Sequence, residues 1–379
     1  MTDSAAIPVA VVAGFPSPQG DRGPSAHVLS ANGLRANEET MDANAPLPMP
    51  TPTVPVKLLT SFKSLSFDIY ETLIQWENSI VQHLEPLLLL PRGDDQATGT
   101  DLSMSSHRAS SLADLFAQHE KDVQAESPGL KYSRVLEQTY LRVAADIGVS
   151  RARARPSPDD SDSDSHSDPD NNRNNAPDED LDFDLQSRAR AFGASVGEWP
   201  AFPDTLDAMN RLINSKHYRM IALSNVDRDS FARTNAPDGP LKNLKFWRVF
   251  TAEDVGSYKP NPRNFEYMFE HLKHLEDDDD DADKAAEEEG GGGGGGGRGQ
   301  AGIGIGKDEN LHVAQSLFHD HVPAKKLGIS SVWINRKGAG TGRADAKWMH
   351  DNDEVGYGWR FNTLGEFADE VERQWAEMK

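Results

Sequence analysis

The chain has 379 residues, and its 61 acidic and 39 basic side chains give a formal net charge of -22. Cysteine is absent, so no disulfide framework can form. No apolar run approaches the roughly 20 residues that a membrane-spanning helix needs, and the acidic balance disfavours nucleic acid because phosphates would be repelled. These features predict a cytoplasmic protein that binds neither a membrane nor nucleic acid.

Most of the net negative charge comes from two blocks, residues 159–184 and 276–289, and the rest of the chain is nearly balanced in charge. The first block overlaps a Ser-Asp-rich segment over 150–180, and the second runs into a glycine tract within 275–306. Neither segment can bury enough apolar surface to offset the entropy lost on ordering, so both are predicted to be disordered insertions. Residues 1–57, rich in Ala, Pro and Ser, are predicted to be a disordered tail.

Short β-prone runs alternate with helical patterns through the remaining chain, which is typical of a parallel α/β sheet. The predicted strands cover 65–69, 220–223, 248–251, 311–313 and 331–334. Between the first two strands, helical patterns at 79–90, 110–124, 130–147 and 183–196 form a block too long for a simple crossover. We therefore predict a sheet core over 58–78 and 198–379, with a helical cap over 79–197.

Polar residues follow the first two strands at the point where each ends. Asp68 lies at the carboxyl end of the first strand, and a carboxylate there lies in the crevice where parallel sheets bind ligands and can act as a covalent nucleophile. A turn or helix-capping role is the alternative for Asp68. Ser224 and Asn225 end the second strand, where a hydroxyl and an amide can hold an anion, although Ser-Asn is also ordinary turn chemistry.

Two further charged residues occupy comparable places. Pro260 keeps Lys259 out of helical geometry, and a Lys there can neutralise a carboxylate and a bound anion. A solvated loop position is the alternative for Lys259. Asp320 lies just beyond the strand at 311–313, between His319 and His321. A metal site is disfavoured for this trio because adjacent positions in a turn rarely point at one ion.

These four pieces, in this order and each after a β-run, resemble the four motifs of the haloacid dehalogenase-like hydrolase superfamily. The type II 2-haloacid dehalogenase branch is the most similar, in a form typical of filamentous-fungal sequences. The resemblance covers roughly 62–90, 130–147, 198–274 and 308–340. It implies a Rossmann-like core with a helical cap inserted after the first motif, and the branch suggests a homodimer.

The resemblance also implies a role for each motif residue. Asp68 would be the nucleophile, Lys259 would balance the charge around it, and Asp320 would position Lys259 or the hydrolytic water. Ser224 and Asn225 would bind a substrate carboxylate or phosphoryl group. By the same resemblance, the residues expected to bind substrate are Tyr70, Thr72, Ser224, Asn225 and Ser316.

Two positions argue for metal-free chemistry. Phosphatases of the superfamily usually carry a second Asp two residues after the nucleophile, and this chain has Tyr70 there. Ser316 stands where a first acid of the fourth motif often stands, so few oxygen ligands remain for Mg²⁺. We predict a hydrolase without a cofactor that cleaves a carbon–halide bond of a small anionic substrate through an aspartyl ester. A Mg²⁺-dependent phosphatase is the alternative.

The chain departs from the dehalogenase pattern around the substrate. Tyr132 aligns with the halide-binding Arg of the family, which leaves Lys131 or Arg134 as substitutes. The other departures are Glu71 for a Gly, Phe265 for a Tyr, and Gln315 and Leu317 for a Ser and an Asn. A third hypothesis is a catalytically silent binding protein, because Glu71 beside Asp68 would raise a carboxyl pKa and weaken the nucleophile.

Overall fold

A six-stranded, all-parallel sheet forms the centre of the described part of the chain, with strand order β3–β2–β1–β4–β5–β6. The computed structural model describes residues 47–90, 105–149, 176–273, 304–336 and 343–379. The strands are β1 Ser64–Phe67, β2 Arg219–Ser224, β3 Arg248–Thr251, β4 Asn310–Ala314, β5 Ser330–Ile334 and β6 Trp359–Phe361. The predicted Rossmann-like α/β class is confirmed.

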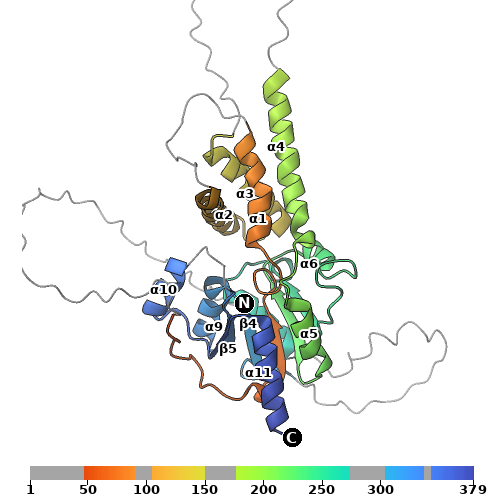
Figure 1. The fold of residues 1–379 in the computed structure, drawn as a ribbon, viewed down its shortest axis with the longest axis vertical. Coiled ribbons are helices and arrows are strands. Elements are labelled where there is room, and N and C mark those ends of the chain that lie inside the picture. Colours follow the sequence, from red (N-terminus) through yellow and green to blue (C-terminus); the bar gives the residue numbers. More distant parts are fainter. Residues whose placement is uncertain (1–46, 91–104, 150–175, 274–303, 337–342) are drawn as a thin grey trace, which may run out of the picture. The chain divides into compact units, whose positions relative to one another are not determined.

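Helices cover both faces of the sheet because side chains alternate along each strand. Met220 and Ala222 of β2 belong to a hydrophobic cluster with α5 Thr205–Asn214 and α11 Leu364–Glu377. Ile221 and Leu223 join a second cluster with α8 Arg263–Leu272 and α9 Val322–Leu327. Figure 1 shows α5 and α11 next to each other against the sheet.

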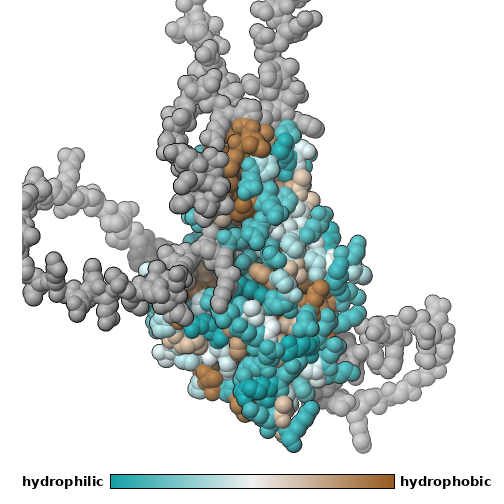
Figure 2. Space-filling model, in the orientation of Figure 1, coloured by the Kyte–Doolittle hydropathy of each residue, from teal (hydrophilic) through white to brown (hydrophobic). Residues whose placement is uncertain are grey.

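Four helices between β1 and β2 form the predicted cap: α1 Glu77–Leu84, α2 Ser105–Glu126, α3 Tyr132–Asp146 and α4 Ala176–Ala194. Each packs against the next in the chain, α1 on α2, α2 on α3 and α3 on α4. Figure 1 shows the four helices gathered together. The helix predicted over 79–90 is shorter, since α1 ends at Leu84 and a 3-10 turn, Glu85–Leu89, follows. Pro86 explains this, because proline lacks the backbone N–H that would donate the next hydrogen bond of the helix. Leu89 in that turn is exposed. Figure 2 shows a hydrophobic patch in the region where α1 is drawn in Figure 1.

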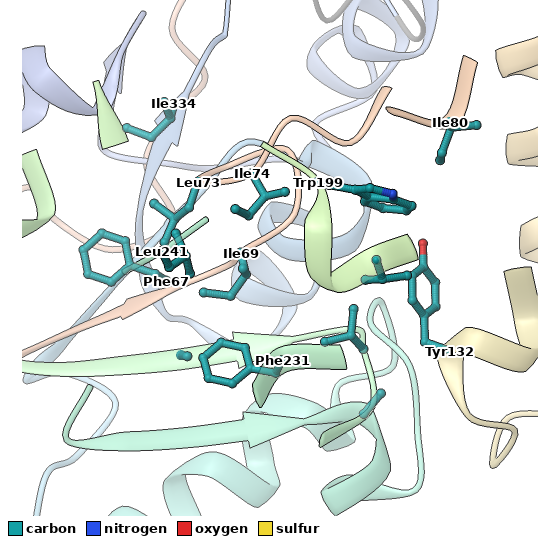
Figure 3. Packing of buried hydrophobic residues seen from close by; sticks show 14 of the residues in the cluster. Phe67, Ile69, Leu73, Ile74, Ile80, Tyr132, Trp199, Phe231, Leu241 and Ile334 are labelled. Carbon is teal, nitrogen blue, oxygen red and sulfur yellow. The ribbon is translucent and has the colours of Figure 1, made fainter. Parts of the chain in front are cut away.

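The chain enters and leaves the cap along two adjacent segments. Ile74 bridges Ala201 in antiparallel fashion, and the Gln75 amide donates to the Pro200 carbonyl at 2.7 Å. Figure 3 shows Ile69 and Leu73, from the loop after β1, between Phe67 and Trp199 in the core. The loop that carries Asp68 is therefore anchored in the hydrophobic core on both sides.

The remaining short helices are α6 Arg228–Thr234, α7 Ala252–Val255 and α10 Arg343–Asp351. None of the described helices combines the length and the apolar character that a membrane-spanning segment requires. Most of the predicted disordered segments, residues 1–46, 150–175 and 275–303, lies outside the described residues. Residues 47–57 fall in the predicted tail, yet the Thr53 amide donates to the Gly356 carbonyl at 2.9 Å. Residues 176–180 of the first predicted insertion begin α4.

Candidate active site

Asp68 is the first residue beyond β1, and its carboxylate is 6% exposed. Its amide donates to the Val313 carbonyl of β4 at 3.1 Å, which fixes the start of the loop. The hydroxyl of Thr72, four residues on, donates to Asp68 Oδ2 at 2.7 Å. The same hydroxyl oxygen accepts the Gln315 amide at 2.9 Å. Thr72 thus holds the Asp68 carboxylate and the loop after β4 in fixed relation.

Lys259 lies between two buried carboxylates. Its Nζ donates to Asp68 Oδ1 at 2.8 Å, to Asp320 Oδ1 at 2.7 Å and to the Leu223 carbonyl at 2.9 Å. The Lys259 side chain is 1% exposed, and so is that of Asp320. Three donor positions of the ammonium therefore meet three acceptors, and the solvated-loop interpretation of Lys259 is wrong. The group carries two carboxylates and one ammonium in a water-poor environment.

Burial and charge act differently on the two carboxylates. Burial raises the pKa of Asp68, and the Lys259 charge offsets this only in part. Burial also opposes ionisation of Asp320, but the Lys259 charge and the His312 hydrogen bond outweigh it and lower the pKa of Asp320. Burial lowers the pKa of Lys259 less than the two carboxylates raise it, so the net shift is upward. The ammonium is thus held between Asp68 and an ionised Asp320.

Asn225 fixes the backbone of Lys259 and lines the cavity. Asn225 Oδ1 accepts the Lys259 amide at 2.7 Å, and its Nδ2 donates to the Lys259 carbonyl at 3.0 Å. Ser224, predicted to share substrate binding with Asn225, ends β2 with a buried Oγ that finds no partner in the described residues. Ser224 and Thr72 do not line the cavity, whereas Asn225 does. The structure therefore separates these two residues from the others of the predicted binding set.

Tyr70 and Ser316 both line the cavity, but their hydroxyl groups are engaged. The Tyr70 hydroxyl lies 2.6 Å from Thr234 Oγ1, and burial raises the Tyr70 pKa. Ser316 Oγ accepts the His319 amide at 3.1 Å, as the N-cap of a single π-helical turn, Leu317–His321. Tyr70 therefore shapes the wall as an aromatic surface, and Ser316 holds the turn that carries Asp320.

The cavity above Asp68 has a volume of about 640 Å³ and lies between the sheet core and the cap. The sheet side supplies Asp68, Asn225, Lys259 and Asp320. The cap side comes from the start of α1, from one face of α2 and from the start of α3. The cap residues that line it are Trp76, Glu77, Asp114, Ala117, Gln118, Glu120, Lys121, Gln124 and Tyr132.

Lys131 and Arg134, the cap cations considered as substitutes for the halide-binding Arg, do not line this cavity. Lys131 lies 3.2 Å from Glu253 and 3.4 Å from Asp229, and Arg134 pairs with Glu137 on its own helix. Lys121 of α2 lines the cavity instead, with its Nζ 5.1 Å from the ring centroid of Phe318. The helical pattern at 110–124 could have suggested Lys121 only if the face turned to the sheet were known.

Tyr132 also lines the cavity, as its alignment with the halide-binding position implied. Its hydroxyl donates to Glu120 Oε1 at 2.7 Å and accepts the Trp76 indole proton at 3.4 Å. Burial raises the pKa of Glu120 to about 7. The cap thus presents a buried phenol–carboxyl pair at the position that aligns with the halide-binding Arg of the dehalogenases.

Glu71 adopts a positive φ of 71°, which is the backbone region that favours the Gly expected at this position. Its Oε2 accepts the amides of Trp76 at 3.0 Å and Glu77 at 3.3 Å, at the start of α1. Burial raises the pKa of Glu71 to about 7. The main cause of the raised Asp68 pKa is burial, and the neighbouring charges that act on it are Lys259 and Asp320. Glu71 therefore anchors α1 and is not the main influence on Asp68.

The donor set around Asp68 does not fit a magnesium ion. The Lys259 ammonium contacts Oδ1 of both Asp68 and Asp320, so one oxygen of each carboxylate is already bound to a cation. Within the described ranges, no group of three or more His, Asp or Glu side chains is arranged to hold a metal ion. His319 and His321 point apart: the His319 ring contacts Ser316 Oγ, and the His321 ring contacts Ser331 Oγ and the Ala314 carbonyl.

Sequence reasoning missed His312, a buried residue of β4 whose Nε2 lies 2.9 Å from Asp320 Oδ1. A His inside an otherwise apolar strand run is the signal that could have found it. Phe265, which replaces an expected Tyr, packs its ring against His312 with centroids 4.8 Å apart. The loss of that hydroxyl therefore leaves an apolar wall beside the imidazole.

No family model matches the sequence, and no curated protein matches it. Solved structures do match: a dehalogenase aligns with a TM-score of 0.51 at 15% identity, over 82% of this chain and 97% of its own. A dehalogenase with an intermediate complex aligns with a TM-score of 0.50, also at 15% identity and over the same shares. The L-2-haloacid dehalogenase from Xanthobacter autotrophicus aligns with a TM-score of 0.50 at 14% identity, over 82% of this chain and 98% of its own. At such identities the likeness is one of fold.

Proposed function

We propose that this chain, which has the haloacid dehalogenase-like fold, is a hydrolase in which Asp68 forms a covalent ester with its substrate. The observation that carries the proposal is the Asp68–Lys259–Asp320 group at the floor of a cavity of about 640 Å³. A carboxylate held in place by Thr72 and Lys259 is oriented for attack on an electrophilic carbon.

The reaction that this geometry favours is hydrolysis of a carbon–halide bond. An Asp68 oxygen attacks the carbon that bears the halogen, the carbon–halide bond breaks, and halide leaves with the bonding electrons. Water then attacks the Asp68 carboxyl carbon, the ester bond to the product oxygen breaks, and the product leaves as an alcohol. Asp320 contacts the same Lys259 ammonium as Asp68 and lines the same cavity, and it is the group that takes the proton of the attacking water.

Among the described residues, Lys121 is the counter-charge that the cap side of the cavity offers to a small anionic substrate such as a 2-haloacid. Lys259 is already engaged by two carboxylates. The wall also carries Glu71 and Glu120, and burial brings the pKa of each to about 7. An anion is therefore favoured when these two carboxyl groups are protonated.

A Mg²⁺-dependent phosphatase is disfavoured by Tyr70, whose hydroxyl pairs with Thr234 where a phosphatase places an acid. A binding protein without turnover is favoured by the acidic cap wall, because dehalogenases carry a halide-binding Arg on that side of the cavity. The released product distinguishes the three functions. Halide release without added metal supports the dehalogenase, and phosphate release with Mg²⁺ supports the phosphatase. No release on either substrate panel supports the binding protein.

The test of mechanism uses the full chain in H₂¹⁸O with a panel of 2-haloacids. Attack of water on the Asp68 carboxyl carbon places ¹⁸O in that side chain, which peptide mass spectrometry detects. Asp68→Asn should abolish both halide release and ¹⁸O uptake, whereas Asp207→Asn, at an exposed carboxylate of α5, should change neither. ¹⁸O found only in the product would contradict the covalent ester.

A further inference from the structure

A chain of buried polar side chains runs along the centre of the sheet toward Asp320. Ser64 and Ser66 of β1 stand opposite Asn310 and His312 of β4 in the parallel register. All four are 0% exposed, in strands whose other side chains are largely apolar. Buried polar groups without partners are costly, so their partners decide how each one is oriented.

The hydrogen bonds of this chain have a defined direction. The Ser64 hydroxyl donates to Asn310 Oδ1 at 2.8 Å, and Asn310 Nδ2 donates to Ser66 Oγ at 2.8 Å. Ser66 Oγ is thus an acceptor for Asn310, which leaves its own proton to donate to His312 Nδ1, 2.9 Å away, when the ring is neutral. An imidazole nitrogen that accepts carries no proton, so the ring proton of a neutral His312 is on Nε2. Nε2 donates to Asp320 Oδ1 at 2.9 Å.

This direction has a consequence at Asp320. Oδ1 receives two donors, His312 Nε2 and Lys259 Nζ. Oδ2 is buried and has no partner among the described residues, although Asp320 lines the cavity. His312 and Lys259 therefore both donate to Oδ1, and the lone pairs of Oδ2 receive no donor from the described residues.

We propose that His312 is a positioning residue for the second half-reaction, in which water hydrolyses the Asp68 ester. With its tautomer set by Ser66, His312 holds Asp320 ionised and leaves Oδ2 to take a proton from that water. The hydroxide oxygen bonds to the Asp68 carboxyl carbon, the ester carbon–oxygen bond breaks, and the released alkoxide takes the proton that Asp320 accepted. This inference rests on the proposed function of Asp68.

The kinetic test separates ester formation from ester hydrolysis. In His312→Leu, halide release in the first turnover should stay within about threefold of the unchanged protein. Ester hydrolysis should slow by about 10²-fold, the lower end of what a positioned general base supplies, and the Asp68 adduct should accumulate in intact-protein mass spectra. His312→Gln, whose amide can still donate to Asp320, should recover part of the hydrolysis rate. Equal slowing of both steps in His312→Leu would overturn the inference.

Two further measurements keep the test decisive. Ser66→Ala removes a single oxygen and serves if His312→Leu does not fold; it should slow hydrolysis more than ester formation. In the ligand-free protein, ¹⁵N spectra of labelled histidines, assigned against His312→Gln, should show the Nε2-protonated tautomer at His312. An Nδ1-protonated ring contradicts the inference whatever the activity. If the unchanged protein takes up no ¹⁸O at Asp68 during turnover, the proposed function is contradicted, while the ¹⁵N spectrum still tests the tautomer of His312.

Discussion

The hydroxyl of Thr72 donates to Oδ2 of Asp68 at 2.7 Å, so the second oxygen of this carboxylate is held from within its own loop. The first oxygen is held by Lys259 at 2.8 Å. Because Thr72 also accepts the Gln315 amide, one hydroxyl connects the loops that follow β1 and β4. Orientation of Asp68 therefore depends on a residue that does not line the cavity.

Thr72→Val should lower kcat about tenfold and lower the free energy of unfolding by ~1–3 kcal/mol, because it removes a donor and leaves a buried amide unpaired. Thr72→Ser should retain most of both. Thr139→Val is the matched control, since the Thr139 hydroxyl is buried without a partner in the described residues, and its removal should not destabilise. Steady-state kinetics and urea unfolding measure the two effects, and equal losses in the two valine variants would contradict the role of Thr72.

Lys259→Met should destabilise the protein by ~3–5 kcal/mol at pH 7, because it leaves Asp68 and Asp320 buried without a counter-charge. The loss should shrink as the pH falls toward 4, because protonation removes the uncompensated charges of Asp68 and Asp320 in the variant. Lys347→Met, at an exposed pair with Asp351, should cost at most about 1 kcal/mol. A loss that does not vary with pH would count against this electrostatic explanation.

Lys121→Met should raise KM for an anionic substrate several-fold and leave KM for the neutral amide of the same compound nearly unchanged, because the cap then lacks its cavity-facing cation. Lys131→Met is the control, since Lys131 pairs with Asp229 and Glu253. If Lys131→Met raises the KM and Lys121→Met does not, the placement of the anion is wrong.

The KM for an anionic substrate should fall as the pH is lowered from about 8 to about 6. Glu71 and Glu120, with pKa values raised by burial to about 7, lose their negative charge over this range and cease to repel the anion. Glu120→Gln keeps an acceptor for Tyr132 and should flatten the profile. The neutral amide serves as the reference, and a KM that rises for the anion toward pH 6 would refute the prediction.

Much of the sheet side of the site follows from position in the chain. Asp68, Asn225 and Asp320 come directly after predicted strands or close to them, and the carboxyl ends of parallel strands meet at one edge. Their proximity, and that of Lys259, was therefore predictable from the sequence. Ser224 shows the limit of this reasoning, because a strand-end residue can point away from the crevice, and its oxygen lies outside the cavity.

The cap side was less predictable. Periodicity located a helix at 110–124, but polar residues occur around most of its circumference, so the face that meets the cavity depends on tertiary packing. Lys131 was chosen by its place in an alignment and instead binds two surface carboxylates. The strand β6 has only three half-buried residues, too few for a period-two pattern to be recognised.

The paired polar residues of β1 and β4 also determine how the two central strands align as the protein folds. A shift of one residue would place Leu65 and Phe67 against Asn310 and His312, and each polar group would be buried without a partner. Misaligned sheets are therefore penalised at their centre, where apolar side chains alone would tolerate several alignments. Since Asp68 follows β1 and Asp320 lies beyond β4, the polar pairs that select the native alignment also set the distance between the two carboxylates that Lys259 joins.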